Sequence, residues 1–427
     1  MANVVSRLSG DENAAKKLKG IYSICSAHPW VLGAAMKQAL DDDTPLLVES
    51  TSNQVDQFGG YTGMKPADFV RFVHLIADRV GLPRERLILG GDHLGPNAWR
   101  GLPAEDAMQR AEALIDAYVA AGFTKIHLDT SMSCAGDPER LSDDVVAERA
   151  SRLCAVAETA AGREGKSEKP VYIIGTEVPV PGGAAEALDT VEVTNPDAAM
   201  DTVAVHRNAW RARGLDDAWQ RVIALVVQPG VEFDHTKVVD YKPELATKLS
   251  DVLEQLPGMV FEAHSTDYQK PESLAALVRD GFAILKVGPG VTFALREALY
   301  ALADVEGELV APEARSNLRE VVERVMLSKP GNWEKYYHGD DQEKRLLRTY
   351  SYSDRVRYYW ADPEIDTAAQ KLIGNLTDVT ISENLLSRYL PEQYWQFRRG
   401  LIDASPMSLI QSKIREVIGA YAAACTA

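Results

Sequence analysis

The sequence has few cysteines, few basic residues and no long apolar run. Its four cysteines include no CxxC pair, which argues against a disulfide framework and against a thiolate zinc site. Sixty-two acidic residues against 46 basic ones give a net charge of −16. This charge disfavours nucleic acid and anionic membranes as partners, because both are polyanions. No stretch is apolar enough for a signal peptide or a membrane span, so we expect a cytoplasmic protein.

Two common nucleotide-binding signatures are also missing. The sequence has no GxxxxGK[ST] loop, which argues against a P-loop kinase, and no GxGxxG turn that would indicate a nicotinamide cofactor. With 427 residues, 46% of them hydrophobic, the chain can form one large domain with an appendage, or two domains.

Eight apolar, strand-like segments alternate with stretches of helical periodicity. This alternation over about 290 residues is typical of a (β/α)8 TIM barrel, a fold of ~250 residues, and a doubly wound sheet is the alternative. We assign residues 1–305 to the barrel and 306–427 to a helical C-terminal extension. The predicted strands are residues 20–27, 45–50, 87–93, 125–130, 171–178, 223–230, 259–266 and 282–289.

Polar residues end nearly every predicted strand. In a barrel, all eight carboxyl ends meet at one face, which is where TIM-barrel enzymes place their active sites. The pattern therefore favours a barrel over an open sheet and predicts an active site at that face. These polar residues are Ser26, Glu49, Asp92, His93, Asp129, Glu177, Gln228, His264 and Lys286.

Three histidines, His93, His235 and His264, follow different predicted strands at this face. Imidazoles that converge beside a carboxylate can bind a divalent metal, and Zn²⁺ is the expected ion. Any one of them alone is more often a structural histidine. Of the other histidines, only His28 has a comparable placement; the rest are His74, His127, His206 and His338.

Carboxylates gather at the same face. Asp92 is the first candidate for a general acid/base, because it adjoins the candidate ligand His93. Glu177, Asp129 and Glu49 are further candidates. Alternatively, some of these carboxylates only orient the histidines.

The segments HSTD and VGPGVT follow the seventh and eighth predicted strands, where barrels often bind phosphate through backbone N–H groups. The cluster of Arg355, Arg357 and Tyr358 could also bind phosphate, but pairing of its arginines with the abundant acidic residues is the favoured interpretation. The predicted substrate- and phosphate-binding residues are Ser265, Thr266, Gly288, Gly290, Lys286, Glu49 and Gln228.

Several longer motifs resemble the GatZ/KbaZ family, from about Gly20 to the C-terminus. That family is known as the non-catalytic subunit of class II tagatose-1,6-bisphosphate aldolase, and members are also called tagatose 6-phosphate kinases. The resemblance implies a barrel fold, a phosphorylated ketose as ligand, a homo-oligomer, and a catalytic aldolase subunit as a partner. The motifs are SICSAHP, ESTSNQVDQFGGYTGM, GGDHLGPN, LDTSMSCAGDP, GTEVPVPGG, VVQPGVEFDH, EAHSTDYQ and SDRVRYYW.

A more distant resemblance is to the catalytic class II aldolases, which pair an acid with a zinc-binding histidine, as Asp92 and His93 do. That resemblance also implies metal-site roles for Glu177, His235 and His264. The sequence departs from these enzymes at residues 265–267 and 286–288, where a glycine-rich phosphate turn and a Lys-x-Asn are usual. These departures argue against bisphosphate binding and ordinary aldolase activity.

The first functional hypothesis is a metal-dependent 4-epimerase of a ketose phosphate, with tagatose 6-phosphate as the expected substrate. The C4 hydrogen lies β to the ketone and is not acidic, so retro-aldol cleavage and re-addition is the accessible route. The second hypothesis is a stabilising subunit for a separate aldolase. Kinase activity ranks third.

Overall fold

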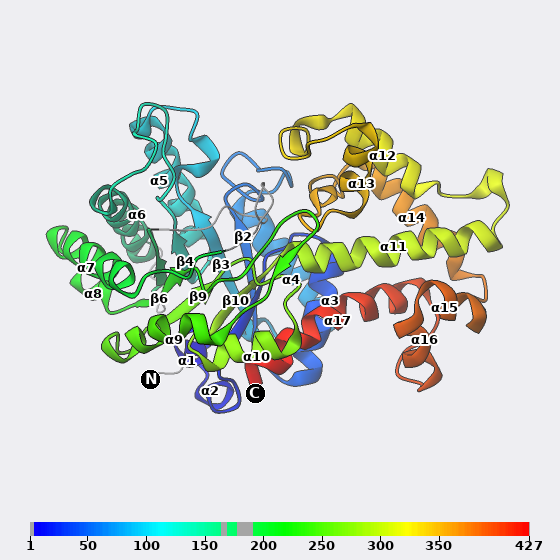
Figure 1. Ribbon diagram of the computed structural model, residues 1–427, viewed down its shortest axis with the longest axis horizontal. Helices are drawn as coiled ribbons and strands as arrows, with labels where there is room; N and C mark the ends of the chain where they lie inside the picture. The colour runs from blue at the N-terminus through cyan, green and yellow to red at the C-terminus, as the bar shows by residue number, and fades with distance from the viewer. Residues whose placement is uncertain (1–3, 164–168, 177–190, 427) are drawn as a thin grey trace.

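The computed structural model describes residues 4–163, 169–176 and 191–426. Within these ranges, eight parallel strands close into a barrel, because β1 pairs with both β10 and β2 (Figure 1). The barrel confirms the predicted (β/α)8 fold and rules out the doubly wound sheet. In their order around the barrel, the strands are β1 (Ile21–Ile24), β10 (Ile284–Val287), β9 (Val260–Ala263), β6 (Val222–Val227), β5 (Val171–Ile174), β4 (Lys125–Leu128), β3 (Leu87–Leu94) and β2 (Leu46–Thr51).

Helices connect the strands and cover the barrel. β6, with the sequence VIALVV, is buried throughout, as expected for a strand with side chains packed on both faces. Six of the described barrel helices begin with proline, which suits the first turn because its missing N–H would have no helical partner there. The helices that follow the eight strands are α3 (Pro29–Asp42), α4 (Pro66–Val80), α5 (Ala104–Ala121), α6 (Asp143–Arg163), α7 (Pro196–Ala212), α9 (Pro243–Asp251), α10 (Pro271–Arg279) and α11 (Pro289–Leu309).

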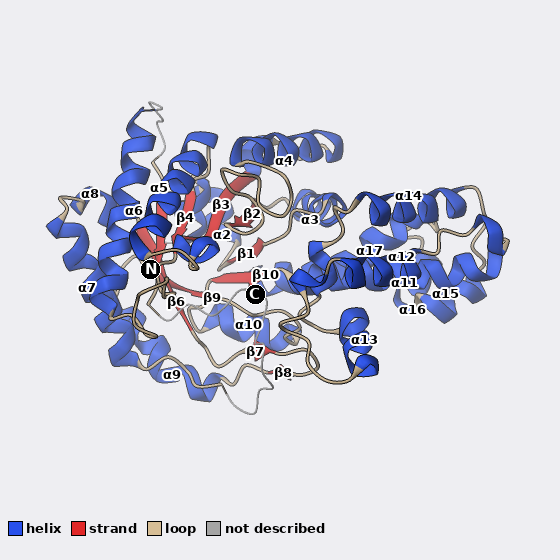
Figure 2. Cartoon of the chain, turned by 90° about the horizontal axis from the view of Figure 1, so that it is seen from above, coloured by secondary structure: helices blue, strands red, loops and turns tan. Residues whose placement is uncertain are grey.

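Helix α11 runs through the predicted boundary at residues 305/306 and carries the C-terminal extension away from the barrel (Figure 1). Figure 2 shows the extension beside the barrel. Its last helix returns along α11 and packs against α3 and α10, so both ends of the extension are fixed to the barrel. The helices of the extension are α12 (Leu318–Ser328), α13 (Asp341–Tyr350), the 3-10 turn η6 (Arg355–Tyr358), α14 (Pro363–Thr377), α15 (Glu383–Tyr389), α16 (Pro391–Arg398) and α17 (Pro406–Thr426).

The remaining elements are short. A two-stranded antiparallel hairpin interrupts the connection from β6 to α9. None of the described helices is both long and apolar enough to cross a membrane. These shorter elements are α1 (Val4–Ser9), α2 (Glu12–Lys17), α8 (Asp216–Trp219), β7 (Glu232–Phe233) and β8 (Val238–Val239).

Candidate active site

A layer of paired charges lies inside the barrel, below its carboxyl-end face. The ammonium of Lys125 on β4 lies 2.7 Å from Glu49 Oε1 and 2.8 Å from Glu262 Oε2. Lys286 on β10 contacts Glu49 and lies 3.1 Å from Asp92 Oδ2. Each of these side chains is buried, and a buried charge costs several kcal/mol unless it is paired. The layer therefore holds its members in a fixed geometry.

The pKa values within this layer favour the charged forms. Burial lowers the pKa of Lys125, but the carboxylates of Glu262 and Glu49 outweigh burial and raise it. Burial raises the pKa of Asp92, yet His93 and Lys286 hold it well below its usual range. Asp92 is therefore ionised near pH 7.

A bulge in β3 explains why Asp92 and His93 lie side by side at the pocket. Neighbouring side chains on a regular strand point to opposite faces. The register of β3 against β4 shifts between Gly91 and Leu94, and His93 has a left-handed φ of 49°. A bulge re-aims side chains in this way, so both residues line the same pocket. Strained backbone of this kind, at a cost of about 1–3 kcal/mol, is frequent at functional sites.

Three imidazoles meet beside the charge layer, and their ring centroids lie 4.9 to 5.3 Å apart. One nitrogen of each ring is bonded to a carboxylate, which fixes the orientation of the ring. The pairs are His93 Nδ1 with Asp129 Oδ2 at 2.7 Å, His127 Nδ1 with Asp92 Oδ1 at 2.8 Å, and His264 Nε2 with Glu262 Oε1 at 2.9 Å.

The ring nitrogens of His127 are arranged as a metal ligand requires, with the proton on one nitrogen and a free lone pair on the other. The backbone N–H of His93 also approaches its Nδ1, at 3.2 Å, but the shorter contact with the Asp92 carboxylate places the proton on Nδ1. Its Nε2 then carries a free lone pair, and this buried atom has no hydrogen-bond partner among the described residues. Burial also lowers the pKa of His264 to about 4, so that imidazole is neutral near pH 7.

Four of these side chains fit a divalent cation. Asp92, His127, Glu262 and His264 each offer one ligand atom, and these atoms lie within 4.8 Å of one another. Imidazole nitrogens and carboxylate oxygens suit Zn²⁺ and similar ions. Of the four, only Asp92 and His264 also line the pocket. The buried group is compatible with a divalent metal site below the pocket floor.

His235 does not join the cluster, which corrects the position expected for it. Its ring nitrogens lie 3.1 Å from Ser351 Oγ and 3.0 Å from the carbonyl oxygen of Tyr336, both in the extension. The physical reason is the β7–β8 hairpin, which begins soon after β6 and carries the chain toward the extension. The prediction assumed that a residue shortly after a strand stays at the barrel mouth.

His127 and Glu262 belong to the buried group and were not among the site residues predicted from the sequence. His127 lies within β4, whereas the predicted site residues were those at the ends of strands. The alternation of side chains along the strand could have identified His127. Lys125, His127 and Asp129 are two residues apart, so all three face the barrel interior. Glu262 and His264 repeat this spacing at the end of β9.

The other predicted residues take different places. His93, His264, Ser265, Lys286 and Gly288 line the pocket with Asp92, whereas Glu49 lies below it and Asp129 behind His93.

Gln228 and Thr266 make structural contacts. The side chain of Gln228 accepts hydrogen bonds from the N–H groups of Gly230 and Val231, and the Thr266 hydroxyl donates to the carbonyl oxygen of Lys286. Glu177 lies outside the described residues.

A carboxylate occupies the backbone site predicted for phosphate. Asp267 Oδ1 accepts hydrogen bonds from the N–H groups of Gly288, at 3.0 Å, and Gly290, at 2.7 Å. These amides open α11, where the helix dipole also favours an anion. Burial raises the pKa of Asp267 to about 6, against these hydrogen bonds, so it is ionised near pH 7. The chain thus supplies its own anion at the position where we expected a phosphate.

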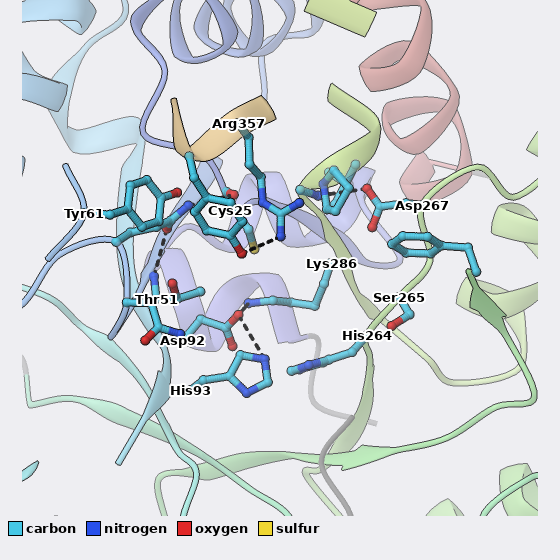
Figure 3. A pocket seen from close by; sticks show the side chains of 17 residues that line it. Cys25, Thr51, Tyr61, Asp92, His93, His264, Ser265, Asp267, Lys286 and Arg357 are labelled. Carbon is cyan, nitrogen blue, oxygen red and sulfur yellow. Dashed lines mark hydrogen bonds and ion pairs between the residues drawn. The ribbon is translucent and has the colours of Figure 1, made fainter. Parts of the chain in front are cut away.

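The extension forms the opposite wall of the pocket. Figure 3 shows Arg357 pointing into the space that Asp92, His264 and Lys286 face from the barrel. Tyr358 and Tyr61 line the pocket beside Arg357, and their rings pack edge to face. Both the barrel and the extension therefore build this site.

The fold and the site define a TIM barrel with a buried carboxylate–histidine group under a pocket. Residues 7–426 match the family described as D-tagatose-1,6-bisphosphate aldolase subunit GatZ/KbaZ-like, and the chain belongs to this family, as its motifs predicted. A probable tagatose 6-phosphate kinase from Sinorhizobium meliloti 1021 has a similar crystal structure, with 53% identity and a TM-score of 0.88, over 95% of this chain and 100% of that one.

A fructose-bisphosphate aldolase from Campylobacter jejuni also matches, at 13% identity and a TM-score of 0.45, over 85% of this chain and 89% of that one.

Proposed function

We propose that this protein is a metal-dependent 4-epimerase that interconverts tagatose 6-phosphate and fructose 6-phosphate. The observation that carries the proposal is the buried group of Asp92, His127, Glu262 and His264, of which Asp92 and His264 line the pocket. A subunit that only stabilises a partner has no need for oriented imidazoles and an ionised carboxylate buried inside its barrel beside a pocket.

The reaction follows from the chemistry of a ketose. As the C3–C4 bond breaks, a base takes the proton of the C4 hydroxyl, C4 becomes an aldehyde, and the bonding electrons form an enediolate at C2 and C3. The aldehyde turns about the C4–C5 bond. C3 then attacks its other face, and the base returns the proton to the new C4 oxygen. Atoms and electrons balance, and no C–H bond breaks.

Asp92 is the residue best placed to carry that proton. It lines the pocket, it is ionised, and His127 and Lys286 hold its two oxygens in place. General acid–base catalysis of this kind contributes about 10²- to 10⁴-fold to a rate. We assign Asp129 the role of orienting His93.

His127, His264 and Glu262 would hold the cation, for which Zn²⁺ is the expected identity, and His93 adjoins them. When bound, a divalent cation polarises the C2 carbonyl and offsets the charge that builds on its oxygen. Lys286 adds a fixed positive charge beside Asp92.

The test is turnover by the purified chain alone. We expect tagatose 6-phosphate to give fructose 6-phosphate when a divalent metal is present, and no reaction after chelation. In D2O the product should contain no carbon-bound deuterium, since the retro-aldol route breaks no C–H bond. Deuterium at C4 would contradict this route, and absence of any product would contradict the proposed activity.

A second candidate function comes from the family description, which implies a subunit that partners a class II aldolase catalytic subunit. Under this alternative, the chain alone turns over nothing and raises the activity or stability of an added class II aldolase. The same preparation decides between the two functions, because the epimerase needs no second chain.

A further inference from the structure

The two walls of the pocket offer very different sites to an anion. On the barrel wall, Lys286 is already paired with Glu49 and Asp92. The amides of Gly288 and Gly290 already bind Asp267. The amides cannot take a phosphate without displacing the Asp267 carboxylate, and two carboxylates already balance the charge of the ammonium.

On the extension wall, the hydrogen-bond partners of Arg357 among the described residues are uncharged. Its Nη2 donates to the Tyr358 hydroxyl at 2.8 Å, and its Nη1 donates to the carbonyl oxygen of Ser353. No carboxylate among the described residues forms an ion pair with it. The neighbouring carboxylate of Asp354 is committed to Arg296 Nε and the Thr292 hydroxyl, each at 2.7 Å. The expectation that this arginine pairs with an acid is therefore not met within the described residues.

This lack of an acidic partner is informative because acids are plentiful. The chain has 62 acidic residues against 46 basic ones. A guanidinium carries five donors in a planar fork that matches phosphate oxygens, and phosphate is dianionic at neutral pH. Arg357 faces the pocket across from Asp92 and His264 (Figure 3). A ligand with its phosphate on Arg357 can therefore extend its sugar chain toward the pocket floor.

We propose that Arg357, with the hydroxyl of Tyr358 beside it, binds the phosphate of the substrate, so that the extension supplies the phosphate site and the barrel supplies the chemistry. This assignment rests on the proposed function, since it takes a phosphorylated ketose as the ligand. It also makes Asp267 a specificity residue. Asp267 fills the backbone anion site, and the pocket accepts a single phosphate and rejects a bisphosphate.

The experiment measures binding separately from turnover. Isothermal titration calorimetry of the metal-loaded protein with fructose 6-phosphate compares wild type with Arg357→Gln, Arg357→Lys and the control Arg345→Gln. Arg345 is an exposed arginine of the extension, outside the pocket, so the control removes the same charge. We expect about 10- to 100-fold weaker binding for Arg357→Gln and a smaller loss for Arg357→Lys, which keeps the charge but not the fork.

The control should bind as wild type does, and binding of unphosphorylated fructose should not change in any variant. Unchanged binding of fructose 6-phosphate by Arg357→Gln would overturn the assignment, and so would a wild type that does not bind this ligand. If Arg357→Gln fails to fold, Arg357→Lys is the test instead: weaker binding of fructose 6-phosphate would support the assignment, and unchanged binding would overturn it. A wild type that binds through Arg357 but does not epimerise would keep the phosphate site and refute the proposed activity.

A second arm tests Asp267. Wild type should bind tagatose 1,6-bisphosphate no more tightly than tagatose 6-phosphate. Asp267→Gly, which frees the amides of Gly288 and Gly290, should gain about 10-fold in affinity for the bisphosphate. Tight binding of the bisphosphate by wild type would show that Asp267 does not close the site.

Discussion

The barrel wall and the extension wall of the pocket differ in how their charges are paired. In the barrel, the buried charges pair with one another: Lys125 with Glu49 and Glu262, and Lys286 with Glu49. In the extension, Arg357 faces the same pocket with no described carboxylate partner. A closed network fixes the shape of a site and the ionisation of its groups, whereas a cation without an acidic partner attracts an anionic ligand. The barrel wall therefore supplies the groups for the reaction, and the extension wall supplies the group that binds the ligand.

The largest effect should come from Asp92, on the barrel wall. Asp92→Asn keeps the shape of the side chain but removes the group that carries the proton, so kcat for tagatose 6-phosphate should fall by about 10²- to 10⁴-fold. Steady-state kinetics measure this loss. Asp240→Asn, which alters a surface pair with Lys270, is the matched control and should keep full activity. Full activity in Asp92→Asn would move the acid/base role to another carboxylate.

The pairing in the barrel wall can be broken at Lys125. Lys125→Met removes the cation between Glu49 and Glu262 and leaves two buried carboxylates without it. The free energy of unfolding should fall by about 3–5 kcal/mol, as for other broken buried pairs. Lys270→Met breaks an exposed pair with Asp240 and should cost ~1 kcal/mol or less. Urea unfolding measures both, and equal losses would mean that the buried network contributes no more than a surface pair.

The buried carboxylate of Asp267, on the barrel wall, should make the stability of the protein depend on pH. Burial raises its pKa from 3.8 in the unfolded chain to about 6 in the folded protein. Between these values the folded state holds a proton that the unfolded state has lost, so this group lowers stability as pH rises from about 4 to 6. The lost stability amounts to about 3 kcal/mol at most. Asp267→Asn removes the titration, so the stability difference between variant and wild type should shift in the variant's favour over this window. A constant difference in thermal unfolding across this window would contradict the raised pKa.

Much of the fold was readable from sequence because its signals are local. Each of the eight strands is an apolar run bounded by turn residues, and the helices between them keep a regular spacing. The C-terminal boundary is less local: α11 is continuous across residue 305, so no change in composition marks where the barrel ends.

The site was only partly readable, since its geometry depends on long-range packing. Asp92 and His264 were found because they end strands. His127 was missed because an inward-facing residue in mid-strand looks like a core histidine. His235 was misplaced because a two-strand hairpin and contacts with Ser351 and Tyr336 decide its position. Whether Arg357 forms an ion pair depends on the position of every acidic side chain near it, and the sequence does not give those positions.

The central claim is that a divalent cation binds among the barrel histidines, and the metal content of three dialysed variants tests it most directly. Circular dichroism first establishes that each variant is folded. Elemental analysis should then find that His127→Ala and His264→Ala lose the bound metal, since each removes a ligand from the buried group. His235→Ala should retain the wild-type content, because its ring is bonded to the extension. Retention of metal by His127→Ala and its loss from His235→Ala would contradict the account.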